Sequence, residues 1–279
     1  MKDVTKKIKD FYENNPFPNY DDLDDASSLM QRARQGLFAK LLDEQIPFGA
    51  RILEAGCGTG QLSNFLSIAN RTVFGTDLCF ASLKLAQQFK QKNKLNSAHF
   101  VQMNLFKPVF KPKSFDLVIC QGVLHHTSFP AEGFRKISQL VKDNGYILIG
   151  LYHKYGRIIT DIRRIIFKLL GNRFSLLDPE LKNLRGRKRD IWFMDQYRNP
   201  HESKHSIREA LRWFNQNGFK FINSVPKTHL WQAFSDKERL FSPNLPASGL
   251  ELFCVELGML FTASSNGGLF IVIGKKTNE

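Results

Sequence analysis

The chain has 279 residues, of which 42% are hydrophobic, so it can bury a substantial core. Its formal net charge of +14 is compatible with an anionic substrate, a nucleic acid or a membrane surface, and selects none of them. The start of the chain lacks a signal-peptide pattern and its apolar runs are too short to cross a bilayer, so we expect a soluble protein of the cytoplasm.

Short apolar, β-branched runs alternate with helical patterns over residues 51–150. The expected strands are Arg51–Ala55, Thr72–Thr76, His99–Gln102, Phe115–Cys120 and Tyr146–Gly150. The expected helices between them are Leu62–Ala69, Ala81–Asn93 and Ala131–Val141, where apolar residues recur every three or four positions. This alternation predicts an α/β fold with a doubly wound, mostly parallel sheet covered by helices on both faces.

The alternation is interrupted after residue 151. A basic insertion follows, in which Leu151–Asp190 holds eleven Lys or Arg against four Asp or Glu. A helix at Ile207–Asn217, a strand at Phe219–Ser224 and a last strand at Leu269–Ile273 complete a predicted seven-stranded sheet. A second insertion, at about 225–265, lies between those last two strands.

The pentapeptide His201–His205 reads HESKH and so matches the HExxH signature of zinc proteases. A working HExxH must be helical, whereas Ser206 and Glu209 have the spacing of a capping box that starts a helix after His205. The four cysteines, at 57, 79, 120 and 254, form no CxxC pair, which indicates neither a zinc site nor a disulfide framework. We therefore predict no metal site.

The strongest signal is ILEAGCGTGQL at Ile52–Leu62, where a strand runs through Glu54 into three glycines that open a helix. Glycines there permit a tight turn and let backbone N–H groups approach a ligand. Polar residues also follow the next strands: Asp77, Asn104 and the segment Gln121–His126. Ligands of open α/β sheets bind beyond the carboxyl ends of the strands, so these loops should converge on one crevice.

The segment Glu54–Gly60 together with Asp77, Asn104 and Gln121–His126 resembles the ordered motifs of class I S-adenosylmethionine-dependent methyltransferases. The sequence GVLHHT is similar to the branch that contains the ubiquinone and menaquinone methyltransferases. The resemblance covers residues 50–150 well, and 206–224 and 268–274 more loosely. It implies a Rossmann-like fold and S-adenosylmethionine as the cofactor, with S-adenosylhomocysteine as its product.

The resemblance also implies roles for individual residues. Glu54 would meet the methionine amino group, Asp77 the ribose hydroxyls, and Asn104, where the family more often has aspartate, the adenine. The full set implied to bind the cofactor is Glu54, Gly56, Cys57, Gly58, Gly60, Asp77, Leu78, Asn104, Leu105, Gln121 and Gly122. A general base is needed only if the acceptor must lose a proton, and the candidates are His126 first, then His125 and His153.

Aromatic and polar residues outside the core are candidates for acceptor contacts. They are Tyr12, Phe17, Tyr20, Tyr152, Trp192, Tyr197 and His201. The expected organisation is an N-terminal lid or strap at 1–48, a cofactor-binding core at 49–151, a basic helical insertion at 152–205 and a C-terminal completion of the sheet at 206–279.

The leading hypothesis is a methyltransferase that acts on a small-molecule acceptor, lipid-like or another secondary metabolite, held under the insertions. An RNA methyltransferase is the enzymatic alternative: the charge favours it, but NPPY-type residues after the fourth strand and a recognisable RNA-binding module are missing. The non-enzymatic alternative is a module that binds the cofactor without turnover. Residues 154–189, with an apolar stripe at helical spacing among basic residues, are a candidate contact for an anionic or membrane surface.

Overall fold

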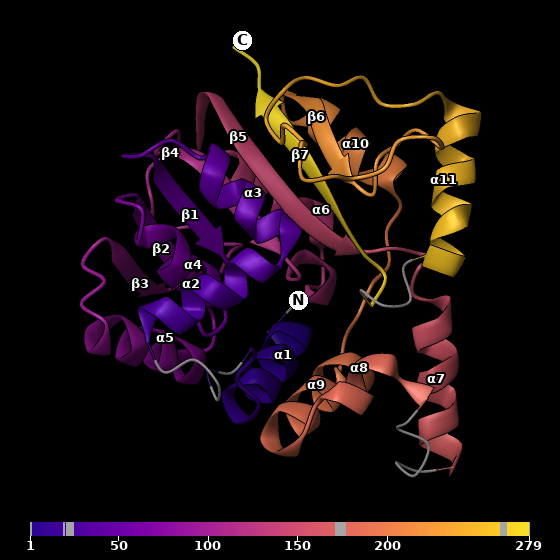
Figure 1. The fold of residues 1–279 in the computed structure, drawn as a ribbon, viewed down its shortest axis with the longest axis horizontal. Helices are drawn as coiled ribbons and strands as arrows, with labels where there is room; N and C mark the ends of the chain where they lie inside the picture. Colours follow the sequence, from indigo (N-terminus) through magenta and orange to yellow (C-terminus); the bar gives the residue numbers. More distant parts are fainter. Residues whose placement is uncertain (1, 19, 21–24, 171–176, 263–266, 279) are drawn as a thin grey trace.

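A seven-stranded sheet forms the centre of the molecule, in the order β3-β2-β1-β4-β5-β7-β6 (Figure 1). The computed structural model describes residues 2–18, 20, 25–170, 177–262 and 267–278. The strands are β1 Arg51–Ala55, β2 Thr72–Asp77, β3 Ala98–Gln102, β4 Phe115–Gln121, β5 Val141–Tyr152, β6 Phe219–Val225 and β7 Leu269–Lys276. The first five run parallel, whereas β7 pairs antiparallel with both β5 and β6. The predicted α/β class is confirmed, with a sheet that is mixed at one side.

Helices cover both faces of the sheet. The connecting helices are α4 Gln61–Ser67, α5 Phe80–Lys92, α6 Pro130–Ser138 and α10 Ile207–Gln216. Before β1 lie α1 Lys2–Asn14, α2 Ala26–Gln35 and α3 Leu37–Gln45. The insertions contain α7 Ile158–Leu170, α8 Pro179–Asn183, α9 Gly186–Arg198 and α11 Gly249–Thr262. Among the residues described, we find no helix with both the length and the apolar character needed to cross a membrane.

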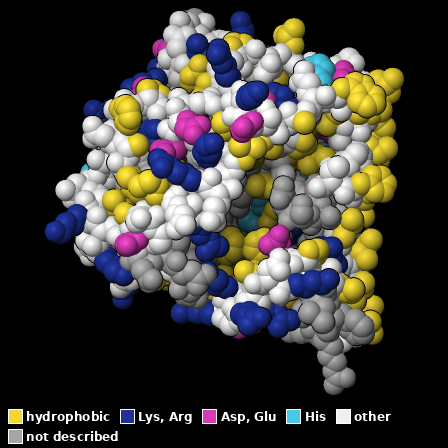
Figure 2. Space-filling model, in the orientation of Figure 1, with side chains coloured by type: hydrophobic (Ala, Val, Ile, Leu, Met, Phe, Trp, Pro, Cys, Tyr) yellow, Lys and Arg dark blue, Asp and Glu magenta, His cyan; other side chains and the backbone are white. Residues whose placement is uncertain are grey.

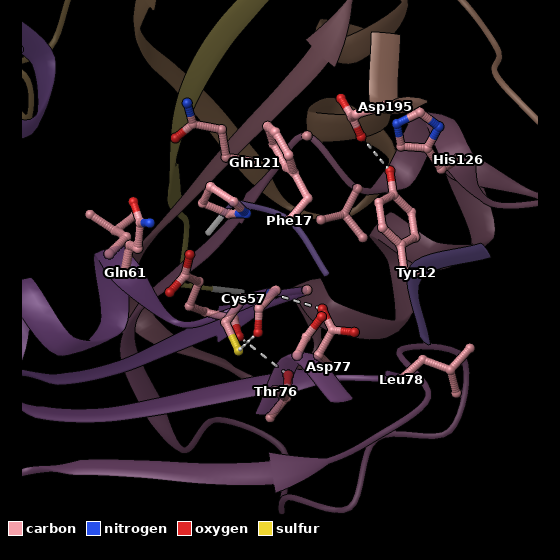
Figure 3. A pocket seen from close by; sticks show the side chains of 18 of the residues that line it. Tyr12, Phe17, Cys57, Gln61, Thr76, Asp77, Leu78, Gln121, His126 and Asp195 are labelled. Carbon is pink, nitrogen blue, oxygen red and sulfur yellow. Dashed lines mark hydrogen bonds between the residues drawn. The ribbon is translucent and has the colours of Figure 1, made fainter. Parts of the chain in front are cut away.

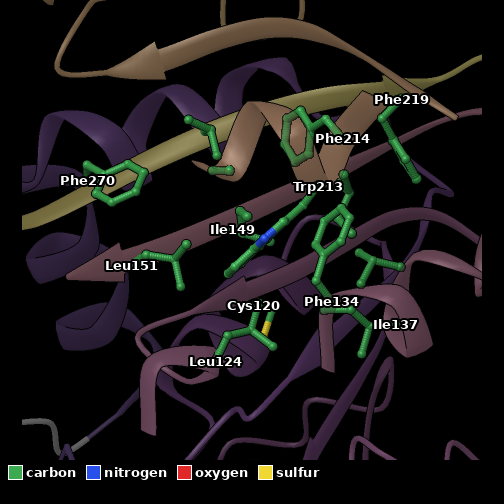
Figure 4. Packing of buried hydrophobic residues seen from close by; sticks show 14 of the residues in the cluster. Cys120, Leu124, Phe134, Ile137, Ile149, Leu151, Trp213, Phe214, Phe219 and Phe270 are labelled. Carbon is green, nitrogen blue, oxygen red and sulfur yellow. The ribbon is translucent and has the colours of Figure 1, made fainter. Parts of the chain in front are cut away.

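Two hydrophobic clusters flank the sheet because neighbouring strand residues point to opposite faces. Leu148 packs in the cluster that includes Leu41 and Phe65, whereas the next residue, Ile149, packs in the cluster of α6 and α10. In the latter cluster Phe134 lies against Phe214 and Trp213, with ring centroids 5.6 and 6.0 Å apart (Figure 4). Buried aromatic contacts of this kind fix the helices on the sheet.

Two predicted boundaries are wrong, the end of α6 and the start of β5, which was expected at Tyr146. The helical pattern at Ala131–Val141 predicts a helix through Val141, but α6 ends at Ser138 and β5 already begins at Val141. The reason is tertiary: Val141 pairs with Phe115 of β4, and the register shifts between Phe115 and Leu117 to admit the extra residues. A bulge of this kind is not visible in hydrophobic periodicity.

The HESKH segment is not helical. Residues 201–204 are irregular, and His205 forms an isolated bridge with His153 before α10 begins at Ile207. Ser206 caps the helix by accepting from the Glu209 N–H, as predicted, but the Glu209 carboxylate contacts the His205 ring at 2.9 Å, so the capping box is only half formed. Within the described ranges, no group of three or more His, Cys, Asp or Glu side chains is arranged to hold a metal ion.

Candidate active site

A cavity of about 550 Å³ lies beyond the carboxyl ends of β1, β2 and β4 and is bordered on its other side by α1 and α9. Figure 3 shows Asp77 and Cys57 in one part of it, and Tyr12, Asp195 and His126 in another. The predicted cofactor residues that line it are Glu54, Gly56, Cys57, Gly58, Asp77, Leu78, Asn104, Leu105, Gln121 and Gly122. Gly60 is not among the lining residues. A Cβ there would lie 2.6 Å from Phe100 and 2.7 Å from Ala86, so this glycine serves helix–strand packing.

The glycine turn brings the backbone close to the N-terminal segment. Gly58 has φ +53°, and a Cβ at this position would lie 2.3 Å from the carbonyl oxygen of Phe17. The neighbouring Thr59 donates its N–H to that oxygen and its hydroxyl to the carbonyl of Pro18. Residues 17 and 18 therefore lie directly over the glycine loop.

Asp77 is fixed by two backbone donors at the end of β2. Its Oδ2 accepts from the Gly58 N–H at 2.9 Å and its Oδ1 from the Cys79 N–H at 2.8 Å. Burial raises the pKa of this carboxyl, although the backbone hydrogen bonds oppose the shift. Each carboxylate oxygen has a second lone pair. Asp77 can therefore accept further hydrogen bonds from a ligand in the cavity.

Glu54, at the end of β1, is a second buried carboxyl on the cavity wall. Ser63 of α4 donates its hydroxyl to Glu54 Oε2 at 2.5 Å. Burial, with a smaller contribution from the charge of Asp77, raises the pKa of Glu54 to about 8. A ligand with a positively charged group beside Glu54 would favour the ionised form of this carboxyl and so lower its pKa.

Asn104 follows β3 and shapes the loop that it belongs to. Its Oδ1 accepts from the Phe106 N–H at 3.0 Å, and both residues line the cavity with Leu105 and Met103. The amide retains a second acceptor lone pair and two N–H donors. The loop thus presents apolar side chains together with one amide, a combination that suits a flat heteroaromatic ring.

The first helix connects both ends of the cavity. The Glu13 carboxylate accepts from the N–H groups of Phe80 and Ala81, both at 2.9 Å, at the start of α5. One residue earlier, Tyr12 donates its hydroxyl to Asp195 of α9 at 2.7 Å (Figure 3). Helix α1 therefore bridges the edge of the sheet and the basic insertion, and covers the cavity between them.

The α9 wall of the cavity consists of Trp192, Asp195 and Gln196, whose spacing places them on one helix face. Gln196 donates to Asp195 Oδ2 at 2.9 Å and to the Tyr152 hydroxyl at 3.0 Å. In the part of the chain that the structure describes, Asp195 takes hydrogen bonds from neutral donors alone, Tyr12 and Gln196.

Buried arginine and glutamate hold this wall in place. Arg157 is fully buried; it donates to Glu202 at 2.5 Å and to Gln196 Oε1 at 2.6 Å, and its guanidinium carbon lies 3.7 Å from the centre of the Tyr152 ring. Arg164 also donates to Glu202, at 3.0 Å. Burial opposes the ionised form of Glu202, but its bonds to Arg157 and Arg164 hold its pKa below the usual value. Arg157 and Arg164 thus make their salt bridges to Glu202, whereas Asp195 makes no direct salt bridge among the described residues, although its charge also acts on Arg157.

Of the three histidines proposed as bases, His126 lines the cavity, whereas His125 and His153 do not. His126 Nδ1 lies 2.8 Å from the His201 carbonyl oxygen and must donate to it, which leaves Nε2 as the acceptor of a bond from His125 Nε2 at 3.1 Å. Burial lowers the pKa of both rings. His153 is fully buried and contacts Phe270. Both nitrogens of His126 therefore already have protein partners.

The predicted acceptor residues divide into two groups. Tyr12, Phe17, Tyr152 and Trp192 line the cavity. Tyr20 instead stacks on Phe89, Tyr197 donates to Asp178, and His201 Nε2 lies 3.1 Å from the Thr127 carbonyl oxygen. These last three support the walls and do not line the cavity.

Several lining residues were not predicted as site residues. They include Leu29, Arg32 and Ala33 of α2, and Gln61, Val123, Asp195 and Gln196. Asp195 and Gln196 had a usable signal, because they lie three and four residues after Trp192 in a helical stretch. The sequence gives no such signal for the residues of α2, because their contact with the cavity depends on how the N-terminal segment folds back.

Comparison with known proteins agrees with this geometry. The sequence pattern of a family described as "Methyltransferase domain" matches residues 53–149. An uncharacterized protein of Synechococcus sp. is 29% identical over 216 residues, covering 68% of this chain and 49% of that protein. A ubiquinone biosynthesis O-methyltransferase of Paracidovorax citrulli is 30% identical over 107 residues, covering 38% of this chain and 45% of that enzyme. The chain thus spans about half the length of both relatives.

A solved structure shares the fold. PKMT2 from Rickettsia typhi, in complex with AdoHcy, superposes with a TM-score of 0.58 at 15% identity, over 87% of this chain and 52% of that one. Residues 53–149 therefore match the methyltransferase domain pattern, and the fold agrees with that of the class I S-adenosylmethionine-dependent methyltransferases, whose cofactor is S-adenosylmethionine. Among the relatives of known activity, this chain resembles the ubiquinone O-methyltransferases.

The residues present fit that cofactor. Two buried carboxyls, Asp77 and Glu54, face the cavity without a cationic partner among the described side chains, and the ligand brings two hydroxyls, an ammonium and a sulfonium. The loop at Asn104 supplies apolar walls for a base.

Proposed function

We propose that this protein transfers a methyl group from S-adenosylmethionine to a small-molecule acceptor bound in the same cavity. The observation that carries the proposal is the continuity of one cavity, from Glu54 and Asp77 at the strand ends to Tyr12, Trp192 and Asp195 under α1 and α9. One end of the cavity has the groups that suit the cofactor. The other end has room and polar groups for a second molecule.

In this proposal Asp77 accepts from the ribose hydroxyls, and Glu54 meets the amino group of the methionine part. Asn104 and Leu105 contact the adenine, and Gln121 with Gly122 flanks the region of the sulfur. When bound, the cofactor supplies a methyl group on a positively charged sulfur, which is already activated for transfer. The protein's own contribution is alignment, and holding two reactants in the correct geometry is worth about 7–11 kcal/mol.

Exclusion of water is the second contribution of this chain. The contacts of Thr59 with the carbonyls of Phe17 and Pro18, and of Glu13 with the start of α5, hold the N-terminal segment over the glycine loop. Movement of α1 would widen the way in for the acceptor and the way out for the product, as lid movements do in many enzymes.

We assign the polar contact with the acceptor to Asp195 in preference to His126. Both nitrogens of His126 are engaged by His125 and the His201 carbonyl, whereas the oxygens of Asp195 keep lone pairs free for a further donor. An acceptor that presents a hydroxyl or an amine to Asp195 would be oriented by it, and could pass its proton to this carboxylate.

Calorimetric titration with S-adenosylmethionine tests the cofactor half of the proposal. We expect micromolar binding that is lost in Asp77→Ala and in Gly58→Leu. The matched control is Asp143→Ala, which removes an exposed carboxylate paired with Lys113 and should bind normally. Unchanged binding in both site variants would remove the proposed site.

The acceptor is identified by incubation with label-bearing cofactor and a host-cell extract, followed by mass spectrometry of the labelled product. Label in a small molecule supports the proposal. Label in RNA, with binding that weakens steeply as salt rises, would favour the alternative suggested by the net charge of +14. Tight cofactor binding with no labelled product would favour a binding module without turnover.

A further inference from the structure

An exposed apolar face runs along the outer side of α11 and α7, and it has no part in the site described above. On α11 it comprises Leu250, Phe253, Leu257 and Phe261, and on α7 Ile158, Ile162, Ile165 and Leu169. Both sets repeat every three or four residues, so each forms one stripe along its helix. The exposed fractions range from 37% for Ile158 to 78% for Phe261. We call this surface the α7–α11 face.

The two stripes form one continuous surface. Helices α11 and α7 follow one another along the same edge of the molecule, and apolar side chains line that edge (Figures 1 and 2). Tyr155, just before α7, contacts Phe253 of α11 with ring centroids 6.4 Å apart. Helices of 14 and 13 residues placed end to end span roughly 40 Å.

A loop extends the face at the start of α11. The Leu230 N–H donates to the Glu251 carboxylate at 3.1 Å, which holds this loop beside the first turn of the helix. The next residue, Trp231, is 95% exposed, and Leu230 and Leu245 are also exposed. Tryptophan is the side chain most enriched where proteins meet the interface of a bilayer.

The carboxylates beside the face are hydrogen-bonded or paired, and basic residues are exposed next to it. The three carboxylates of α7 and α11 all have partners: Asp161 pairs with Lys204 and Arg164, Glu251 with His229, and Glu256 accepts from the Arg208 N–H. Lys154 and Lys168 are exposed beside the α7 stripe. The surrounding segment, residues 151–190, has eleven Lys or Arg against four Asp or Glu.

We propose that the α7–α11 face docks on the surface of an anionic phospholipid bilayer. An apolar patch of this size on a protein surface marks an interaction site. The stripe forms an outer edge of the molecule in Figure 2, and basic residues border it, as in helices that lie in the plane of a membrane interface. The proposal is independent of the methyl transfer, since no residue of the face lines the cavity.

Vesicle flotation tests the proposal with the full chain. We expect the protein to float with vesicles of phosphatidylcholine and phosphatidylglycerol at 3:1, at least tenfold more strongly than with phosphatidylcholine alone, and to dissociate as salt rises. The double variant Ile162→Asp/Ile165→Asp should lose at least tenfold in partitioning, and so should Leu250→Asp/Leu257→Asp on the other helix.

The matched control is Phe48→Asp/Val109→Asp, which adds the same charge at two exposed apolar residues, 78% and 65% exposed, outside the face. It should bind vesicles as the unchanged protein does. Unaltered thermal unfolding and cofactor binding in the face variants show that they are folded. The proposal would be overturned if Phe48→Asp/Val109→Asp lost as much vesicle partitioning as the face variants, or if the unchanged protein did not bind vesicles.

Cys254 offers a direct readout, because it is exposed on α11 while the other three cysteines are buried. A polarity-sensitive fluorophore on this thiol should shift to shorter wavelength with the anionic vesicles. The same label in Cys254→Ser/Val109→Cys should not shift. A dimer in solution that the face variants convert to monomer, without a vesicle-induced shift at Cys254, would assign the face to a second copy of the chain and contradict the proposal.

Discussion

The contact between the glycine loop and the N-terminal segment can be tested by adding one methyl group. Gly58 has φ +53°, and a Cβ would lie 2.3 Å from the Phe17 carbonyl oxygen. Gly186 has almost the same dihedral angle, φ +54°, but a Cβ there meets nothing within 4 Å. Gly58→Ala and Gly186→Ala therefore both place a residue with a Cβ in the left-handed conformation. Only in Gly58→Ala does the new Cβ collide with the Phe17 carbonyl oxygen.

The magnitude follows from these geometries. A left-handed conformation costs a residue with a Cβ about 1–2 kcal/mol, so Gly186→Ala should lower the free energy of unfolding by that amount. Gly58→Ala must also displace residues 17 and 18, which weakens two hydrogen bonds from Thr59, each worth about 0.5–1.5 kcal/mol. We expect a total loss of about 2–5 kcal/mol. A displaced segment also uncovers the cavity, so the affinity for S-adenosylmethionine should fall at least tenfold.

Urea unfolding and calorimetric titration of both variants measure the two effects. The expected result is a larger loss of unfolding free energy and a clear loss of cofactor affinity in Gly58→Ala, with normal cofactor affinity in Gly186→Ala. Equal stabilities and equal affinities in the two variants would refute the argument that residues 17 and 18 cover the loop.

Three further predictions follow from the buried charges. Burial raises the pKa of Glu54 to about 8. The folded protein therefore holds a proton that the unfolded chain releases near pH 4.5. Because of this difference, the contribution of Glu54 to the free energy of unfolding should fall as pH rises from about 4.5 to 8. At pH 7, cofactor binding should release a proton, seen as a dependence of the calorimetric enthalpy on the buffer, and Glu54→Gln should abolish that dependence. In Asp195→Asn we expect at least a tenfold loss of kcat/KM for the acceptor with cofactor affinity within twofold of normal, and loss of cofactor affinity instead would contradict its assignment to the acceptor. Arg157→Met leaves Glu202 buried beside Arg164 alone and should cost about 3–5 kcal/mol in urea unfolding, whereas a loss below 1 kcal/mol would show that the pair contributes little.

The sheet could be predicted well because its signals are local. Six of the seven strands begin within one residue of the expected position, since buried β-branched runs and glycine turns specify strands without help from distant residues, whereas β5 begins at Val141 and not at Tyr146. The predicted end of α6 was wrong because the pairing of Val141 with Phe115 depends on a bulge within β5, between Val141 and Tyr146.

The cofactor end of the cavity was predictable for a similar reason. Glu54 and Asp77 lie at the ends of β1 and β2, Asn104 follows β3, and parallel strands bring their carboxyl ends to one edge. Gly60 departs from this pattern because its lack of a side chain serves packing against Phe100 and Ala86.

The acceptor end depends on long-range contacts that a sequence pattern does not encode. Tyr12 and Asp195 lie 183 residues apart and meet through a hydrogen bond. The engagement of His126 by His125 and by the His201 carbonyl is likewise a tertiary feature. Residue type alone made His126 the first candidate base, whereas its hydrogen bonds led us to propose Asp195 for the contact with the acceptor.

A crystal structure of the complex with S-adenosylhomocysteine tests the central claim most directly. We predict that both ribose hydroxyls lie within about 3.2 Å of the Asp77 carboxylate, with the amino group beside Glu54 and the adenine against Leu105. A ligand bound elsewhere, or a ribose that does not contact Asp77, would contradict the account.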